Sequence, residues 1–164
     1  MFGGALESRA AALVRAAAAL GMKIATAESC TGGLVSALIT SVAGSSAVYE
    51  RGFIVYSNAA KIDMLGVPEA LIAGFGAVSE ECARSLAEGA IARSHADLAV
   101  SVTGVAGPGG GSAQKPVGLV HFACARRGGA TVAQTMRFGD IGRAAVRSAS
   151  VEAALSLLES AVLR

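Results

Sequence analysis

The segment that most constrains the fold is a nearly continuous apolar run at residues 97–103. A strand that is apolar on both of its faces needs cover on both sides, and such strands are typical of sheets with helices packed on each face. The chain has 164 residues, of which 53% are hydrophobic and 16% are charged. This length suits one domain with one core, so we expect residues 1–164 to form a single α/β domain.

Helical and strand-like segments alternate along the chain. Apolar residues at helical spacing, with glycines that end helices, predict helices over residues 5–20, 34–44, 58–66, 79–94 and 140–162, with a further turn or two at 68–73. Asn58, Ser79 and Asp140 are the expected N-caps of three of them. Runs of β-branched and aromatic residues predict strands over residues 22–27, 47–57 with a bend near Gly52, 97–103, 117–125 and 131–138.

The last two predicted strands are joined by the short sequence Arg126-Arg127-Gly128-Gly129. Such a connection is typical of a β-hairpin and makes this pair antiparallel. The earlier strands are separated by helices, which favours parallel pairing. The predicted fold is therefore a three-layer α/β/α sandwich on a mixed, mainly parallel sheet of about five strands.

Composition excludes several classes of function. Fourteen basic and twelve acidic residues leave a net charge of +2, and the chain has no Trp, so a nucleic-acid interface is not expected. The three cysteines never occur in a CxxC spacing and there are two histidines, which argues against a metal site. Charged residues interrupt every apolar run before it could span a membrane, and the first residues lack the pattern of a signal peptide. We therefore expect a cytoplasmic protein with no membrane partner.

The first candidate loop is Glu28-Ser29-Cys30-Thr31-Gly32-Gly33, which lies between a predicted strand and a predicted helix. A hydroxyl there is exposed, and N–H groups of the first helical turn can stabilise an oxyanion or a phosphate. Ser29 or Thr31 could instead be an ordinary N-cap. Cys30 is a rival nucleophile because thiols near helix N-termini are acidified. Neither His95, between a helix and a strand, nor His121, in mid-strand, is well placed to pair with it.

The second candidate loop runs from Tyr56 to Lys61 and includes Asn58. A lysine can act as a base only when its amine is neutral, which requires a lowered pKa. The first turn of a short helix and apolar neighbours would both lower the pKa of Lys61. A solvated surface lysine is the alternative, and Tyr56 could either orient the lysine or be a half-buried strand residue.

The third candidate loop, residues 101–118, is rich in glycine and contains Thr103, Gly104, Gly107 and Lys115. Its many backbone N–H groups and its cation suit a phosphate or a ribose. It lacks the spacing of a Walker A motif, and a flexible loop without a ligand remains an alternative. Functional loops of open α/β sheets gather beyond the carboxyl ends of strands, so we expect the three loops to converge.

Taken together, these motifs resemble the nicotinamide-nucleotide amidohydrolase family, also known as the CinA C-terminal domain. The resemblance covers residues 5 to 160 approximately, and the segments that carry it are Thr26–Gly33, Gly44–Ser46, Arg51–Asn58 with Lys61, Gly76–Ser79 and Thr103–Gly118. It implies a three-layer α/β/α fold on a mixed sheet. It also implies hydrolysis of the linear amide of nicotinamide mononucleotide to nicotinic acid mononucleotide and ammonia, a step of pyridine nucleotide (NAD) recycling.

The resemblance further implies a serine-lysine mechanism without a metal or an organic cofactor. Ser29 would be the nucleophile, Lys61 the base, and Tyr56 an assisting residue, while N–H groups around Cys30 to Gly33 or Gly104 would hold the oxyanion. The expected residues at the substrate are Glu28, Cys30, Thr31, Gly32, Gly33, Asn58, Thr103, Gly104, Gly107 and Lys115.

Two other functions stay open at the level of sequence. One is a catalytically silent module that binds a nucleotide, and the other is a hydrolase that uses Cys30. The expected partner is a small nucleotide, and alanine-rich helices with flat faces would allow a homodimer.

Overall fold

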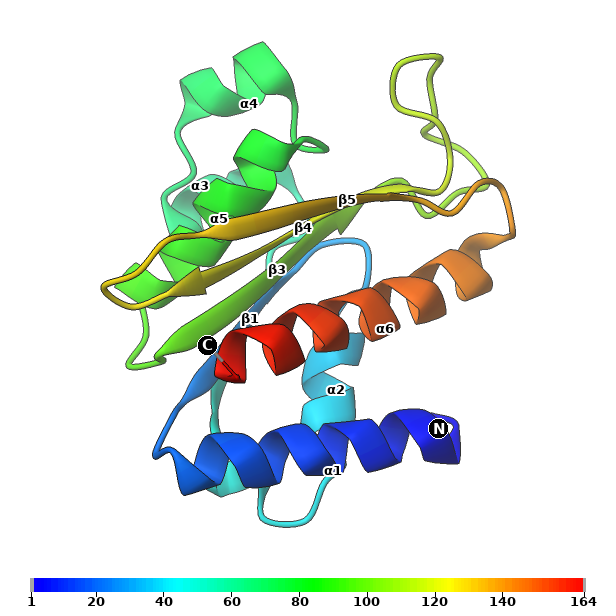
Figure 1. The fold of residues 1–164 in the computed structure, drawn as a ribbon. Coiled ribbons are helices and arrows are strands. Elements are labelled where there is room, and N and C mark those ends of the chain that lie inside the picture. The colour runs from blue at the N-terminus through cyan, green and yellow to red at the C-terminus, as the bar shows by residue number, and fades with distance from the viewer. Residues whose placement is uncertain (1, 164) are drawn as a thin grey trace.

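Strand β3 (Leu98–Gly104) lies at the centre of a five-stranded sheet in a computed structural model that describes residues 2–163 (Figure 1). Its residues 98–103 are all buried, as the continuous apolar run predicts. Its neighbour β1 (Ile24–Glu28) is also buried along its whole length. Both strands are covered on both faces because helices pack above and below them.

The sheet is mixed, with the strand order β2-β1-β3-β4-β5. Strand β2 (Tyr49–Ile54) and β3 both pair parallel with β1. Strand β4 (Leu119–Arg126) pairs antiparallel with β3 and with β5 (Val132–Arg137), so β4 alone runs against the others. The predicted hairpin and the predicted mixed, mainly parallel sheet are confirmed.

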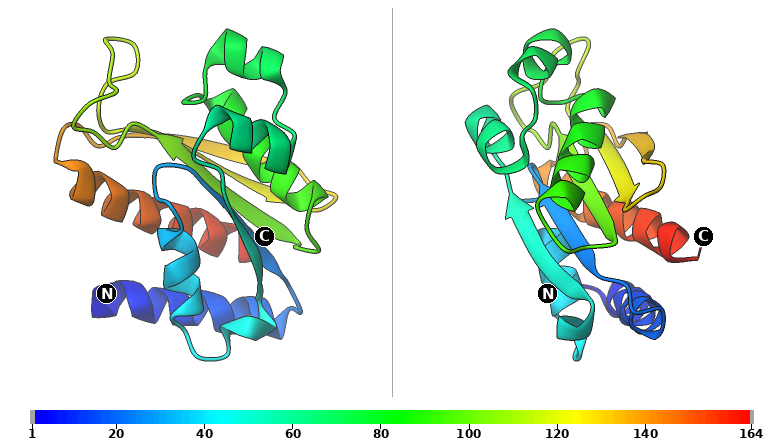
Figure 2. Two further views of the ribbon diagram at one scale, coloured as in Figure 1. Left: turned by 180° about the vertical axis from the view of Figure 1, so that it is seen from behind. Right: turned by 90° about the vertical axis from the view of Figure 1, so that its left-hand side faces the viewer.

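Two helical layers enclose the sheet (Figures 1 and 2). One layer contains α1 (Gly4–Ala19), α2 (Leu34–Thr40) and α6 (Arg143–Val162). The other contains α3 (Asn58–Leu65), α4 (Glu69–Phe75) and α5 (Glu80–Ala92). A short 3₁₀ turn, η1 (Ser45–Ala47), precedes β2. The larger part of the core lies between β3, β4 and the α1, α2 and α6 layer. No helix within residues 2–163 combines the length and the apolar character needed to cross a membrane.

Some helix ends differ from the expectation. The hydroxyl of Ser57, and not the side chain of Asn58, caps α3 by accepting from the Ala60 N–H at 3.0 Å. Helix α6 begins after Gly142 without a side-chain cap, so the predicted role of Asp140 is wrong. The irregularity of β2 lies at Glu50, because Ile24 and Ala25 pair with Tyr49 and Arg51. Ser79 caps α5 as predicted, by accepting from the Cys82 N–H.

Close packing between α5 and the end of α3 yields the first prediction. A Cβ atom added at Gly89 would overlap the backbone carbonyl oxygen of Leu65. Alanine normally stabilises a helix relative to glycine by about 1 kcal/mol, but overpacking costs about 1–3 kcal/mol. We expect Gly89→Ala to lower the free energy of unfolding in urea. The matched control Gly74→Ala, where nothing lies within 4 Å of the added atom, is expected to leave stability unchanged or slightly raised.

Candidate active site

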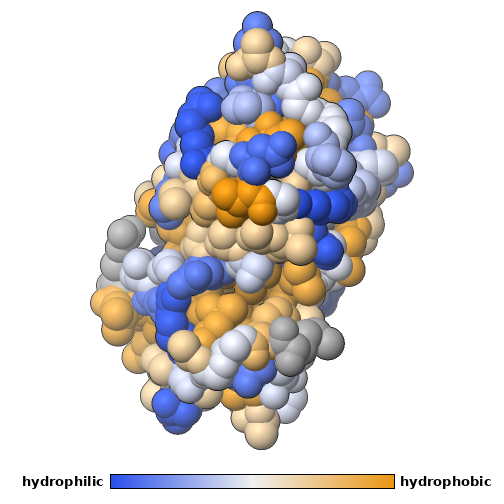
Figure 3. Space-filling model, turned by 90° about the vertical axis from the view of Figure 1, so that its right-hand side faces the viewer, coloured by the Kyte–Doolittle hydropathy of each residue, from blue (hydrophilic) through white to orange (hydrophobic). Residues whose placement is uncertain are grey.

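Loops that follow β1, β2 and β3 meet at one end of the sheet and enclose a cavity of about 200 Å³. Figure 3 views the molecule from the side that carries these loops, where apolar side chains lie between clusters of hydrophilic ones. The lining residues are Ser29, Cys30, Tyr56, Asn58, Lys61, Ala77, Val78, Thr103, Gly104, Ala106 and Arg143. All three candidate loops contribute, so their convergence agrees with the rule that functional groups gather beyond the carboxyl ends of strands.

The centre of the cavity is a direct contact between Ser29 and Lys61. The Lys61 Nζ atom donates to Ser29 Oγ at 3.2 Å, and it also donates to the backbone carbonyls of Val55 at 2.8 Å and Tyr56 at 3.1 Å. Lys61 is the fourth residue of α3, and its side chain is 1% exposed. The solvated surface lysine considered from the sequence is therefore excluded.

The surroundings of Lys61 favour its neutral form. Burial lowers the pKa of the amine below its ordinary value of 10.5, and the nearby thiols of Cys82 and Cys30 oppose this effect in part. A neutral amine has two N–H donors and one lone pair. When the amine is neutral, the two carbonyls take both N–H donors, so the hydrogen bond to Ser29 reverses and the Ser29 hydroxyl donates to the lone pair of Lys61. The geometry thus suits removal of a proton from Ser29.

Cys30 is a weaker candidate for the nucleophile. Its side chain is 6% exposed, and burial raises the pKa of its thiol to about 11, although Arg147 and Arg143 oppose this shift. A thiol with that pKa is protonated at neutral pH, whereas the thiolate is the reactive form. Neither histidine lines the cavity. His95 is exposed, and His121 Nδ1 lies 2.9 Å from Thr135 Oγ1.

Tyr56 lies at the mouth of the cavity. Its side chain is 61% exposed, and its hydroxyl accepts from the Arg143 Nη2 atom at 3.2 Å. The part of Tyr56 that contacts Lys61 is its backbone carbonyl. The phenol is therefore placed to contact a bound ligand, and the contact that orients Lys61 comes from the main chain.

Glu28 is placed differently from the expectation that it binds substrate. Its carboxylate is fully buried and accepts hydrogen bonds from the N–H groups of Gly33, Val35 and Ser36 at 2.8–3.1 Å, and from the Ser36 hydroxyl at 2.7 Å. Glu28 thus occupies the N-terminus of α2, whose N-cap Gly33 has no side chain to do so. The N-terminus of this helix is closed to a substrate anion.

Five further residues of the expected substrate site also lie outside the lining of the cavity. The Gly32 N–H donates to the Ser29 carbonyl at 3.1 Å, and Thr31 is fully buried. The Gly107 carbonyl accepts from Arg143 Nη1 at 2.9 Å. The Lys115 ammonium donates to the Phe75 carbonyl at 2.6 Å, so it joins the glycine-rich loop to the end of α4. Gly33, whose N–H is taken by Glu28, is likewise absent from the lining.

Sequence reasoning missed Arg143 and the small residues Ala77, Val78 and Ala106. Arg143 is the first residue of α6 and reaches Tyr56, which is 87 positions earlier in the chain. Nothing in the sequence distinguishes it from an arginine on a solvated helix face. Ala77 and Val78 lie in the segment Gly76–Ser79, and their position next to Gly76 in that motif is the sequence signal that could have placed them at the site.

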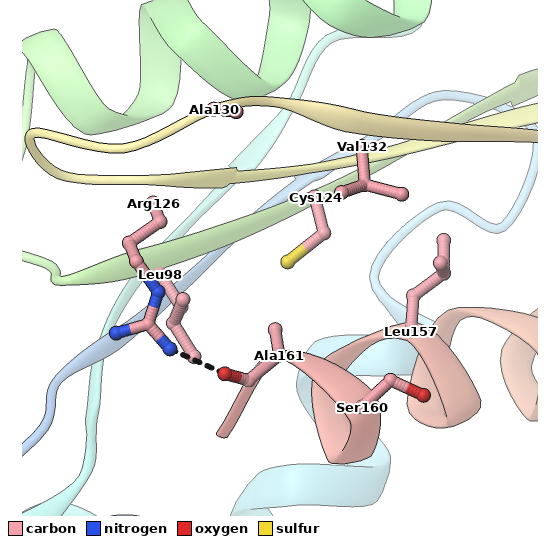
Figure 4. Close-up of a pocket in the computed structure, with 8 residues that line it drawn as sticks. All are labelled: Leu98, Cys124, Arg126, Ala130, Val132, Leu157, Ser160 and Ala161. Atoms are coloured by element: carbon pink, nitrogen blue, oxygen red, sulfur yellow. Dashed lines mark hydrogen bonds between the residues drawn. The ribbon is translucent and has the colours of Figure 1, made fainter. Parts of the chain in front are cut away.

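Another cavity lies at the opposite end of the sheet and is unsuited to chemistry (Figure 4). Its volume is about 60 Å³, and it is lined mostly by apolar atoms of residues such as Leu98, Val132 and Leu157. The Arg126 guanidinium beside it donates to the Ala161 carbonyl in α6. In the part of the chain that the structure describes, no three His, Cys, Asp or Glu side chains come together as a metal site would require.

The sequence and the fold match one family throughout. The model of the CinA C-terminal domain matches residues 6–162. The chain is 47% identical over 162 residues to a CinA-like protein of Anaeromyxobacter sp. (strain Fw109-5). The aligned region covers 99% of this chain and 39% of that protein. The crystal structure of the competence/damage inducible protein CihA from Agrobacterium tumefaciens is similar with a TM-score of 0.97, 51% identity, and coverage of 100% and 99% of the two chains.

A crystal structure of the competence damage-inducible protein A (ComA) from Klebsiella pneumoniae is also similar, with a TM-score of 0.92, 35% identity, and coverage of 97% and 98%. The chain spans between 28% and 39% of the length of the first four curated relatives that it matches. The family model and these similarities extend over nearly all of the described residues. The chain therefore belongs to the CinA C-terminal domain family.

Proposed function

We propose that this chain is an amidohydrolase that converts nicotinamide mononucleotide to nicotinic acid mononucleotide and ammonia. The observation that carries the proposal is the buried Lys61 amine within 3.2 Å of the Ser29 hydroxyl, inside a cavity that opens to solvent through Tyr56 and Arg143. A module that only binds a nucleotide would gain nothing from burying an amine against a hydroxyl, since burial of an ionisable group costs stability.

The chemistry proceeds in two halves. In the first, Lys61 takes the proton of Ser29 as the oxygen attacks the carboxamide carbon, and it then gives that proton to the departing nitrogen, which leaves as ammonia. This produces an ester between Ser29 and the pyridine carboxyl group. In the second, Lys61 takes a proton from water, hydroxide attacks the ester, and the proton returns to Ser29 as nicotinic acid mononucleotide leaves.

The oxyanion of each tetrahedral intermediate needs N–H donors that face the cavity. Glu28 takes the N–H groups of Gly33 and Val35, so the first turn of α2 cannot supply them. Backbone N–H groups near Cys30 and Gly104, which both line the cavity, remain the candidates. The residue that follows the nucleophile commonly has this role in serine hydrolases.

The size of the cavity suggests how the nucleotide is divided. A volume of about 200 Å³ is smaller than the roughly 300–1,000 Å³ of sites that enclose a whole drug-sized ligand. The pyridine carboxamide would occupy the cavity, while ribose and phosphate lie at its mouth. The exposed Arg143 guanidinium lies there, and guanidinium groups suit bidentate recognition of phosphate.

This division predicts a specific effect of Arg143→Met. Hydrogen bonds to charged groups contribute about 1.5–3 kcal/mol, so KM for nicotinamide mononucleotide should rise about 10- to 100-fold with a smaller change in kcat. The kcat/KM for nicotinamide riboside, which has no phosphate, should be little affected. Steady-state assays of ammonia release measure both. Lys115→Met is the matched control, because Lys115 lies outside the cavity lining. Equal losses on the two substrates would contradict the phosphate role.

Ammonia release from nicotinamide mononucleotide by the purified wild-type chain tests the function itself. The amidohydrolase produces stoichiometric ammonia and nicotinic acid mononucleotide. A silent module would bind the nucleotide in calorimetry and release no ammonia, and that result would replace the proposal.

A further inference from the structure

Helix α6 reaches the site with two arginines that are one turn apart. Arg143 contacts the Tyr56 hydroxyl and the Gly107 carbonyl at the mouth of the cavity. Arg147, four residues later on the same side of the helix, does not line the cavity. Its Nε atom donates to the Cys30 carbonyl at 3.1 Å, and its Nη2 atom donates to the Thr31 carbonyl at 3.0 Å. Two successive carbonyls of the turn that carries Ser29 are thus bound by one guanidinium.

We infer that Arg147 is a positioning residue that fixes the Ser29 turn, residues 28–33, in the conformation required for attack. The inference rests on the proposed function in that it takes Ser29 as the nucleophile. Arg147 does not line the cavity, so its effect passes through the backbone of Cys30 and Thr31.

The geometry of the peptide bonds supports this role. In a trans peptide the N–H group points away from the carbonyl of the preceding residue. Because the Cys30 and Thr31 carbonyls both face Arg147, the N–H groups of Thr31 and Gly32 point to the other side. The Gly32 N–H accordingly donates to the Ser29 carbonyl at 3.1 Å. Without Arg147, either carbonyl could turn toward the cavity, where it would repel an oxyanion.

Other hydrogen bonds fix the two ends of the Ser29 turn, so its middle residues need a separate contact. The Ser29 N–H donates to the Val102 carbonyl at 3.0 Å, which fixes the start of the turn to β3. Glu28 fixes its end to α2 through the N–H of Gly33. Arg147 binds the two residues between these points. A guanidinium suits this task because its rigid planar fork presents N–H donors in fixed directions toward the two carbonyls, whereas a lysine ammonium is a compact charge on a flexible stem.

The charge of Arg147 is directed at the turn as well. Among residues 2–163, no carboxylate lies within salt-bridge distance of its guanidinium, so its hydrogen bonds are to backbone carbonyls. The positive charge lies beside the turn that carries Ser29, and no carboxylate of the described residues forms an ion pair with it. An oxyanion formed beside Cys30 would be stabilised by this charge, while a carbonyl would gain less.

The test compares Arg147→Met with Arg126→Met. Arg126 is a matched control because its guanidinium also binds a backbone carbonyl between α6 and the sheet, that of Ala161, at the end of the helix away from Ser29 (Figure 4). We expect Arg147→Met to lower kcat by about 100-fold, the loss typical of a misplaced reacting group, with KM little changed. Arg126→Met is expected to lower Tm to a similar degree and to leave kcat unchanged. Equal kcat values for the two variants after correction for folded protein would overturn the inference.

Chemical rescue separates positioning from a general loss of structure. A cavity of about 230 Å³ beside Arg147, lined by Phe2, Leu34 and Val151 among others, gives a small cation access to the space that Arg147→Ala would leave. Guanidinium at concentrations well below those that unfold the protein should raise the kcat of Arg147→Ala at least several-fold, with saturation. It should not raise the kcat of Arg126→Ala. A role in positioning would be contradicted if guanidinium did not rescue Arg147→Ala and if Arg147→Lys also kept the kcat of the wild type.

Labelling of Ser29 by a fluorophosphonate distinguishes failure of this inference from failure of the proposed function. The rate of covalent labelling, followed by mass spectrometry, depends on the reactivity of Ser29 and needs no nucleotide. Slow labelling of Arg147→Met beside fast labelling of the wild type supports the inference. Equal labelling rates overturn it while Ser29 stays established as a nucleophile, and a wild type that is neither labelled nor active contradicts the proposed function.

Discussion

Ser29→Ala is expected to lower the rate of ammonia release from nicotinamide mononucleotide by about 10⁴-fold or more. The variant keeps the cavity and the proposed phosphate contact but lacks the oxygen that would form the ester, and loss of a nucleophile typically costs this much or more. Binding of the nucleotide should be nearly unchanged, since within residues 2–163 the Ser29 hydroxyl makes one hydrogen bond, the one with Lys61. Parallel measurement of kcat by ammonia release and of Kd by calorimetry checks both parts.

Cys30→Ser is the control for this experiment, because Cys30 is adjacent and lines the same cavity. With its thiol pKa raised to about 11, Cys30 is not expected to act as the nucleophile, so this variant should keep most of the wild-type activity. The opposite pattern, an active Ser29→Ala and an inactive Cys30→Ser, would establish the cysteine hydrolase in place of the serine enzyme.

Lys61→Met should have the second largest effect, a fall in kcat of about 10³-fold or more. General acid-base catalysis contributes about 10²–10⁴-fold, and in the proposed mechanism one amine serves both halves of the reaction. Because Ser29 and Lys61 act as a unit, the double variant should be no slower than Ser29→Ala alone. Additive losses in the double variant would show that Lys61 acts elsewhere than on Ser29.

The pH dependence of the wild type should report the same amine. The proposed mechanism requires neutral Lys61, so kcat/KM should rise with pH through the pKa of Lys61, which burial places below 10.5. This acid limb should be absent from the residual activity of Lys61→Met. A limb that is unchanged in the variant would assign the titration to another group.

The free energy of unfolding should also depend on pH through the lowered pKa of Lys61. Between the lowered pKa of Lys61 in the folded protein and 10.5 in the unfolded chain, the unfolded state binds more protons, so the free energy of unfolding of the wild type rises with pH there. Lys61→Met lacks this linkage. The stability of the variant relative to the wild type should therefore decline as pH rises toward 10.5, which urea unfolding over a pH series measures.

Much of the fold is predictable because its signals are local. The apolar run of β3, the glycines after β1 and the short connection between β4 and β5 each determine their own segment. The N-caps were less predictable, since Ser57 and Asn58 are both suitable residues and their positions differ by one. Which one caps α3 depends on where the chain leaves β2, and this is set by packing.

The site residues likewise divide into those that local signals predict and those that depend on packing. Ser29 follows β1, Gly104 ends β3 and Lys61 lies in the helix that follows β2, so the topology brings all three to one end of the sheet. The carboxylate of Glu28 belongs to the same motif, yet its side chain points to α2, because alternate residues of a strand face opposite sides. The arginines of α6 could not be predicted, since their contacts depend on how a helix from the other end of the chain docks.

Helix α6 follows every other helix and strand of the structure in chain order, and it carries both arginines of the site. During synthesis, Ser29 and Lys61 leave the ribosome long before Arg143 and Arg147 do. Chains grow at about 5–20 residues per second, so Ser29 and Lys61 are synthesised several seconds before Arg143 and Arg147. A nascent or truncated polypeptide that stops after β5 would contain the proposed nucleophile and base but would lack the two guanidinium groups that contact the site.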